Sequence, residues 1–219
     1  MDLVIIDYGS GNLKSVENAF KNSVIVNNLK FNIIVTNNLN LISDADHLVL
    51  PGVGSFPDCK KGLQQITGLY NLLTNEVINR RKKFLGICVG MQLMVKYSLE
   101  KKRTTGFGWL NGNFKKIKKE GLDYLGRNYK IPHIGWNNLQ IEDKSHPIFE
   151  NISEKEQYYF VHSYALDNKN SNEILANTIY NRKIPAIIGK DNYIGVQFHP
   201  EKSGNSGQKF IYNWLKWTP

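Results

Sequence analysis

A cysteine stands between two glycines in the run FLGICVGMQ, residues 84–92. The apolar stretch before Cys88 is strand-like and the stretch after it suits a helix, a pattern that predicts a sharp strand-to-helix turn presenting a reactive side chain. Gly86 and Gly90 are needed because a β-carbon at either position would collide with neighbouring backbone in so tight a turn. The helix dipole at such a turn favours the thiolate. The alternative is a small buried cysteine between two packing glycines.

A second motif, VQFHPEK at residues 196–202, carries a histidine and a glutamate two residues apart. Residues i and i+2 of an extended segment point to the same side, so Glu201 is placed to hold the imidazole of His199 in one tautomer. The other ring nitrogen then faces the thiol of Cys88, which gives the nucleophile, base and orienting group of covalent catalysis. Pro200 stiffens the segment. Alone, a His-Pro-Glu run is usually a turn, so this hypothesis depends on its pairing with the cysteine.

A third motif, LPGVGSF at residues 50–56, follows an apolar run that is typical of a strand. Two glycines at a strand end allow the backbone N–H groups of Gly52, Val53 and Gly54 to turn toward the oxyanion of a tetrahedral intermediate. The N–H of Val89, one residue after the proposed nucleophile, is the natural second donor. An ordinary Pro-Gly turn is the alternative interpretation.

Strand-like and helix-like segments alternate over the first half of the chain, which favours an α/β fold with a mostly parallel central sheet flanked by helices. The segment from about Phe107 to Ile194 consists of short aromatic and β-branched runs, and it predicts additional antiparallel strands. We expect one domain over residues 1–219. The predicted strands are Leu3–Asp7, Ile33–Thr36, His47–Leu50 and Phe84–Ile87, and the predicted helices are Asn12–Asn22, Gly62–Arg81, Val89–Tyr97 and Ser206–Leu215.

Composition narrows the function classes. The net charge of +9 comes from scattered lysines without a helix-turn-helix or stacked-aromatic signature, so it favours an acidic protein partner or an anionic substrate over nucleic acid. No apolar run approaches the about 20 residues that span a bilayer. Two cysteines, no signal peptide and no zinc spacing fit a reducing cytoplasm and no metal. The loop at Gly9–Asn12 lacks the pattern of a nucleotide site, so no cofactor is expected.

Together, PGVG, GICVGMQ and QFHPEKS, in this order, resemble the class I (triad) glutamine amidotransferases, whose fold is flavodoxin-like. Three further motifs, DYGSGNL at 7–13, PHIGWN at 132–137 and YFVHSY at 159–164, resemble the glutaminase subunit of imidazole glycerol phosphate synthase. This resemblance extends from about residue 2 to about residue 215. It departs at Val89, where leucine is more usual.

The resemblance implies that Cys88, His199 and Glu201 hydrolyse glutamine through a thioester. It also implies that Gln92 and Glu100 contact the substrate and that the backbone of His162-Ser163-Tyr164 meets its α-carboxylate. A surface role for Glu100 stays open, and His162 is expected to be packed rather than catalytic. His133 and His146 are expected to be structural or exposed. The positions that match the synthase-facing side are Asn12, Trp136, Asn137 and Lys202, although Trp136 also suits a core.

A glutaminase of this length is expected to need a partner, because free ammonia in neutral water is mostly protonated. The resemblance implies a (β/α)₈ cyclase subunit that receives ammonia and makes imidazole glycerol phosphate and AICAR in histidine biosynthesis. Two alternatives stay open. One is a paralogue with the same triad that serves another synthase, for example in surface-sugar biosynthesis. The other is a regulatory subunit that has lost catalysis.

Overall fold

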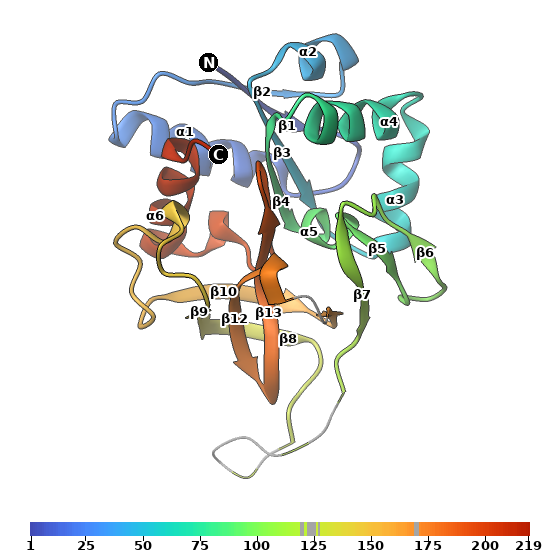
Figure 1. Ribbon diagram of the computed structural model, residues 1–219, viewed down its shortest axis with the longest axis vertical. Helices are drawn as coiled ribbons and strands as arrows, with labels where there is room; N and C mark the ends of the chain where they lie inside the picture. The colour runs from blue at the N-terminus through green and yellow to red at the C-terminus, as the bar shows by residue number, and fades with distance from the viewer. Residues whose placement is uncertain (119–120, 122–125, 127, 169–170) are drawn as a thin grey trace.

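The computed structural model describes residues 1–118, 121, 126, 128–168 and 171–219. Its main sheet has eight strands, in the order β2 (Asn32–Thr36), β1 (Asp2–Ile6), β3 (His47–Gly52), β4 (Lys83–Cys88), β14 (Tyr193–Val196), β13 (Arg182–Lys190), β12 (Ile174–Tyr180) and β9 (Gln140–Ile141) (Figure 1). The five strands from β2 to β14 are parallel, and β13, β12 and β9 continue the sheet antiparallel. The predicted fold class is confirmed.

Two smaller sheets and several helices complete the described chain. The two-stranded sheet pairs β8 (His133–Asn138) with β10 (Gln157–His162), and the four-stranded sheet holds β11 (Tyr164–Asp167), β7 (Leu110–Lys116), β5 (Val95–Ser98) and β6 (Thr104–Thr105). The α-helices are α1 (Leu13–Val26), α2 (Leu39–Asp44), α3 (Phe56–Gln65), α4 (Leu69–Thr74), α5 (Val89–Leu93) and α6 (Gly204–Lys216). A π-helical turn spans Asn75–Asn79, and 3-10 turns span Pro147–Phe149, Ser171–Glu173 and Pro200–Lys202.

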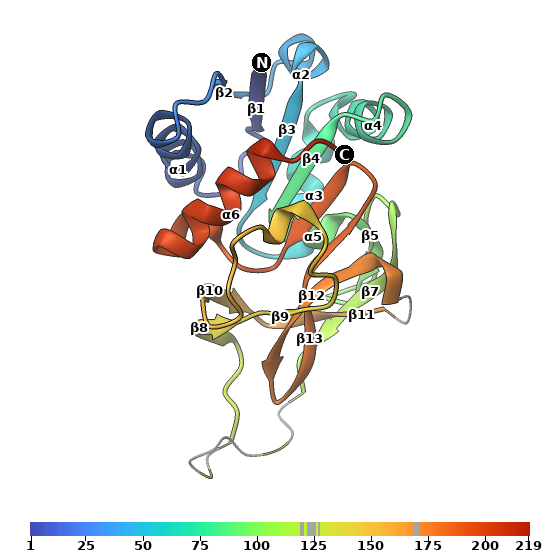
Figure 2. The ribbon, with the colours of Figure 1, turned by 60° about the vertical axis from the view of Figure 1, so that its left-hand side comes forward.

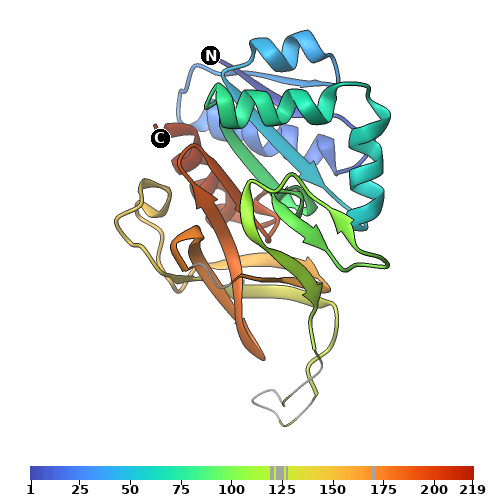
Figure 3. The same cartoon turned by 45° about the vertical axis from the view of Figure 1, so that its right-hand side comes forward.

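Helices cover both faces of the parallel strands, with α1 and α6 packed together on one side and α4 on the other (Figure 2). Phe20 of α1 meets Trp214 of α6 edge to face, with 5.9 Å between ring centroids, and both side chains are fully buried. The four-stranded sheet lies beside α3 (Figure 3). Across the described ranges, no helix has the length and apolarity needed to cross a membrane. The single-domain organisation stays a prediction.

The three sequence motifs meet at the carboxyl edge of the parallel strands. Gly52, at the end of β3, is paired with Cys88, at the end of β4. Val196 ends β14, which is the other neighbour of β4, and the histidine motif follows it directly. Because β3, β4 and β14 are parallel neighbours, their carboxyl ends lie at one edge, and the motifs that follow them come together there. Ligands of open α/β sheets bind outside this edge.

Two predicted helices were wrong in extent. The prediction of Val89–Tyr97 as one helix fails because α5 ends at Leu93 and the chain continues as β5, parallel to β7. The prediction of Gly62–Arg81 fails because Gly68, with φ of 87°, separates α3 from α4, and a π-helical turn follows α4. Local periodicity described the apolar stripes but not these breaks, which tertiary packing decides.

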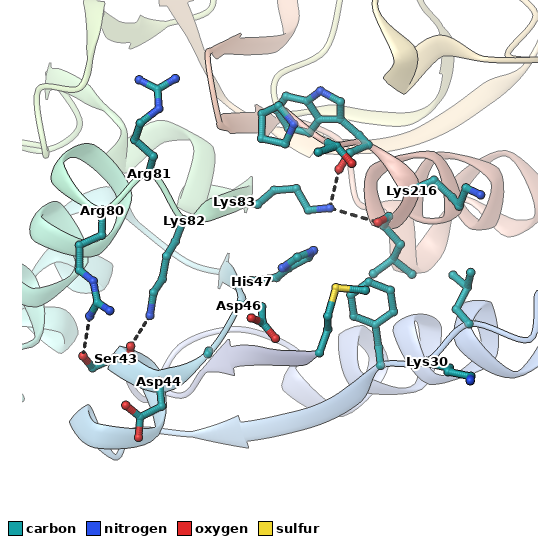
Figure 4. Close-up of a pocket in the computed structure, with 18 residues that line it drawn as sticks. Lys30, Ser43, Asp44, Asp46, His47, Arg80, Arg81, Lys82, Lys83 and Lys216 are labelled. Carbon is teal, nitrogen blue, oxygen red and sulfur yellow. Dashed lines mark hydrogen bonds between the residues drawn. The ribbon is translucent and has the colours of Figure 1, made fainter.

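A cavity of about 830 Å³ lies at the opposite, amino edge of the sheet, where β3 and β4 begin (Figure 4). Two lysines in its lining donate hydrogen bonds to backbone carbonyls of distant segments. The ammonium of Lys83 donates to the carbonyls of Leu215 (3.1 Å) and Trp217 (2.7 Å), which end α6. Lys82 donates to the carbonyl of Ser43. Burial lowers the pKa of Lys83 to about 8. The basic lining therefore anchors the end of the chain, far from the three motifs.

Candidate active site

Cys88 lies at the tip of a strained turn between β4 and α5. Its φ of 54° and ψ of −109° are unusual for a residue with a β-carbon, and such strain is held only where the surroundings fix it. A β-carbon on Gly86 would lie 2.7 Å from the carbonyl carbon of Gly90, and one on Gly90 would lie 1.8 Å from the carbonyl oxygen of Leu50. Both glycines are thus required by close backbone contacts.

The structure brings Cys88, His199 and Glu201 together. The Nδ1 atom of His199 lies 2.7 Å from Oε1 of Glu201, and the side chain of Cys88 lies close enough to the same imidazole to raise its pKa. All three side chains are at least nine-tenths buried. The hydroxyl of Ser203 fixes the segment, because it donates to the carbonyl of His199 (2.6 Å) and accepts from the N–H of Tyr159 (3.0 Å).

Electrostatics favour a charged imidazole at this site. Burial by itself lowers the pKa of His199, but hydrogen bonds and charge interactions with Cys88 and Glu201 outweigh it and raise this pKa to about 10. An opposite charge within hydrogen-bonding distance stabilises the charged form of each partner. The arrangement therefore suits an imidazolium beside the sulfur of Cys88.

Gln197 belongs to the site, although the motif analysis did not select it. Its Nε2 donates to Sγ of Cys88 at 3.6 Å, and its Oε1 accepts from Nε2 of Gln92 at 3.1 Å. A donor to sulfur stabilises the thiolate. The extended segment expected for this motif is wrong, because the chain bends at residues 197–198 and forms a 3-10 turn over Pro200–Lys202, and this turn brings Glu201 back to His199.

A cavity of about 130 Å³ opens beside Cys88, and all five predicted substrate-contacting residues line it. The lining consists of Gly54, Cys88, Val89, Gln92, Glu100, Pro132, Val161, His162, Ser163 and Tyr164. Pro132 and Val161 were not predicted. Glu100 is half-buried, and its Oε2 accepts from the N–H of Phe56 at 2.7 Å, at the start of α3. Its carboxylate is therefore a fixed part of the cavity wall rather than a free surface group.

The predicted oxyanion loop is tied to Ser10 in this conformation. The N–H of Val53 donates to the Ser10 hydroxyl (3.3 Å), and that hydroxyl donates to the carbonyl of Val53 (2.7 Å). The thiol of Cys59 also donates to this carbonyl at 3.5 Å. The Val53 N–H is thus engaged away from the cavity. Gly54 lines the cavity with φ of 105°, and Gly52 packs so closely that a β-carbon would lie 2.8 Å from the N atom of Gly90.

The amide of Val89 is better placed. Val89 is the first residue of α5, and the N–H groups in the first turn of a helix have no carbonyl partner within it. Val89 also lines the cavity next to Cys88, as does Gly54. Of the predicted oxyanion donors, the N–H of Val53 is thus the one whose role would require a change in the loop.

Two of the four predicted interface residues, Trp136 and Lys202, lie beside the ring of Tyr159, whereas Asn137 follows Trp136 in β8 and points to the other side of the strand, toward His133. Trp136 is 52% exposed, which excludes the core alternative, and its ring lies 5.9 Å from that of Tyr159. The ammonium of Lys202 lies 5.9 Å from the same Tyr159 ring. Asn137 is half-buried and donates to the carbonyl of Ile179 (2.9 Å). Asn12 caps α1 by accepting from the N–H of Ser15. In the part of the chain that the structure describes, no three His, Cys, Asp or Glu side chains form a metal-binding cluster.

Comparisons with known proteins agree with this geometry. The family model for glutamine amidotransferase class-I matches residues 4–217. "Imidazole glycerol phosphate synthase subunit HisH" of Brucella melitensis is 43% identical over 222 residues, covering all of both chains, and the protein of the same name in Rhodospirillum rubrum is 39% identical, also over all of both chains.

Solved structures show the same fold at low identity. A structure titled as a glutamine amidotransferase superposes with a TM-score of 0.69 at 14% identity, covering 97% of each chain. A glutamine amidotransferase from Thermotoga maritima gives a TM-score of 0.58 at 15% identity, covering 99% of this chain and 83% of that one. The family model and the full-length identities above show that the chain belongs to the class-I glutamine amidotransferases and, within them, to the family of HisH subunits of imidazole glycerol phosphate synthase.

Proposed function

We propose that this chain hydrolyses glutamine to glutamate and ammonia through a thioester on Cys88, and that it delivers the ammonia to a (β/α)₈ cyclase subunit in histidine biosynthesis. The observation that carries the proposal is the convergence of Cys88, His199 and Glu201 beside a cavity lined by Gln92 and Glu100. The relatives are named as subunits of imidazole glycerol phosphate synthase, which supports this pathway.

The reaction follows from the roles of the neighbouring groups. The thiolate of Cys88 attacks the side-chain amide carbon of glutamine, and the negative charge moves to the amide oxygen near the Val89 N–H. His199 gives its proton to the departing ammonia, which leaves a glutamyl thioester. Water then attacks the thioester while His199 takes a proton, and glutamate leaves with the thiolate restored. Glu201 orients His199 throughout.

Glutamine recognition is proposed for the residues that line the cavity. The carboxylate of Glu100 is suited to pair with the α-ammonium of the substrate, because its other oxygen is already fixed by the N–H of Phe56. The backbone of Ser163 and Tyr164 is proposed to meet the α-carboxylate. Gln92 is held by Gln197 and faces the same cavity.

Ser10 is expected to restrain resting activity, because its hydroxyl occupies both backbone groups of Val53. Replacing Ser10 with alanine removes these two hydrogen bonds, so we expect basal glutamine hydrolysis by the isolated chain to rise about tenfold, as the Val53 N–H becomes free to serve the oxyanion. The measurement is glutamate release without a partner. Ser145→Ala, on an exposed turn, is the matched control. Unchanged or lower basal activity in Ser10→Ala would remove this role.

The pathway is tested with the cognate cyclase and its ribulosyl substrate. We expect glutamate release to increase at least about tenfold when both are added, since a coupled partner can contribute one to three kcal/mol of coupling free energy. A face that carries the exposed Trp136, Ile134 and Ile179 is the proposed docking surface. Absence of stimulation, with the triad active, would favour the paralogue that serves another synthase.

The same proposal places the chain in the cytoplasm and assigns it no cofactor. Cys59 and Cys88 are both free thiols, as a reducing compartment allows. The chemistry uses only side-chain and backbone groups, so neither a metal nor a nucleotide enters any step. The regulatory alternative, without catalysis, is disfavoured by the intact contact between Glu201 and His199.

A further inference from the structure

Two buried histidines outside the triad form a hydrogen-bonded series that ends at the glutamine cavity. Nδ2 of Asn137 lies 3.3 Å from Nε2 of His133, and Nδ1 of His133 lies 3.0 Å from Nε2 of His162. Nδ1 of His162 then lies 2.8 Å from the carbonyl oxygen of Tyr164. His133 is 2% and His162 is 5% exposed. Every ring nitrogen in the series therefore has one partner.

The carbonyl at the end of this series fixes its direction. A carbonyl only accepts, so Nδ1 of His162 carries the proton and Nε2 must accept. His133 therefore donates through Nδ1, and its own Nε2 accepts from the amide of Asn137, which also donates to the carbonyl of Ile179. Burial lowers the pKa of His133 to about 3 and that of His162 to about 4, so both rings are neutral, as this pattern requires.

The last bond of the series closes the bend that lines the cavity. His162 ends β10 and Tyr164 begins β11, with Ser163 between them, and all three line the cavity beside Cys88. The carbonyl of Ser163 is held separately by the N–H of Ile117 at 2.9 Å. The imidazole of His162 is thus the side-chain tie across this bend, and its orientation depends on His133.

We propose that His133 is a positioning residue for glutamine binding, which donates to Nε2 of His162 and thereby holds this ring, and the Ser163–Tyr164 bend that its Nδ1 ties, against the substrate. That the ligand is glutamine rests on the proposed function. The tautomer of His162 follows from its hydrogen bonds and does not depend on that function. His133 touches no reacting atom. Its effect is expected on the affinity for glutamine rather than on the chemical step.

The chain offers a series of matched variants. His133→Phe keeps a flat ring between Phe160 and Tyr180, whose centroids lie 4.9 and 4.0 Å away, but removes the donor. His133→Asn returns an amide donor near the place of Nδ1, and His133→Gln places its amide nearer to Nε2. Loss of the donor leaves Nε2 of His162 without its partner, while the carbonyl of Tyr164 still favours the Nδ1–H form.

The first measurement is the ¹⁵N NMR signature of the His162 side chain in the isolated, ligand-free chain. We expect the Nδ1–H tautomer in every variant, because the Tyr164 carbonyl still accepts from it. We expect the Nε2 chemical shift of a hydrogen-bonded acceptor in the wild type and in His133→Asn, and that of a free nitrogen in His133→Phe and His133→Gln. The second is steady-state glutamine hydrolysis in the complex with the cyclase. We expect KM for glutamine to rise about tenfold in His133→Phe, with kcat within about twofold, as for the loss of one hydrogen bond. His133→Asn should restore KM.

An Nε2–H tautomer of His162 in the wild type would overturn the inference, as would an unchanged KM in a folded His133→Phe or a loss confined to kcat. Should His133→Phe fail to fold, the comparison of His133→Asn with His133→Gln decides, and equal KM values for these two would also overturn it. A wild-type complex that does not hydrolyse glutamine would overturn the proposed function and this role together. If the wild-type complex hydrolyses glutamine and the His133 variants keep its KM, only the role of His133 is overturned.

Discussion

Replacing Cys88 with alanine is expected to lower glutamine hydrolysis by at least about 10⁴-fold, because triad residues act as a unit and no other group at the site can form the thioester. The second thiol, Cys59, cannot substitute. Its side chain is fully buried and shares a hydrogen bond with the hydroxyl of Ser10, and burial raises the pKa of its thiol. The measurement is glutamate release by the chain in complex with its cyclase.

The fold and the complex are expected to survive this change, since a cysteine-to-alanine replacement keeps the β-carbon and the strained φ of the turn. Ammonium salts supplied in place of glutamine provide the control, because the cyclase should still make product from them in the Cys88→Ala complex. Glutamate release near the wild-type rate would contradict the thioester mechanism. Loss of the ammonium-dependent reaction as well would show that the variant had damaged the complex instead.

Gly90→Ala is expected to lower the free energy of unfolding by more than about 4 kcal/mol, which places it among the largest single-residue effects. The new β-carbon would lie 1.8 Å from the carbonyl oxygen and 3.0 Å from the carbonyl carbon of Leu50, and this backbone is held in β3 by its pairing with β4. Neither β3 nor the turn after β4 can move apart without breaking the pairing of these two strands. The measurement is the free energy of unfolding of the purified variant in denaturant. If the variant is too unstable to purify, the measurement is its absence from the soluble, folded protein.

Gly204→Ala is the matched control. Gly204 is the first residue of α6, as Gly90 is the second of α5, and its φ of 55° is positive, but a β-carbon there meets no atom within 4 Å. Its cost should be confined to backbone strain, about 1–3 kcal/mol. Equal destabilisation by the two alanines would show that steric contact at the nucleophile turn is not what requires Gly90.

Sequence reasoning selected the candidate triad because its signals are local. The spacing of Gly86, Cys88 and Gly90 follows from the sterics of one turn. His199 and Glu201 do meet, but through the 3-10 turn Pro200–Lys202 rather than through the alternation of an extended chain. The parallel sheet then brings both segments to one edge. Gln197 was missed because a glutamine carries no catalytic signature by itself.

Other features depend on contacts between distant segments and could not be predicted. The hydrogen bonds between Ser10 and Val53 join residues 43 positions apart, so the engaged state of the oxyanion loop has no local signal. The end of α5 at Leu93 is set by the pairing of β5 with β7, which overrides the helical character of the segment. Likewise, the contact between His133 and His162 exists only because β8 and β10 pair in that register.

Reaction with an electrophilic glutamine analogue, 6-diazo-5-oxo-L-norleucine, tests the proposed nucleophile most directly. Peptide mass spectrometry of the chain, treated in its cyclase complex, should find one adduct on Cys88 and none on Cys59, and excess glutamine should protect the site. Modification of a different residue, or an unmodified Cys88 in a complex that still hydrolyses glutamine, would contradict covalent catalysis by this thiol.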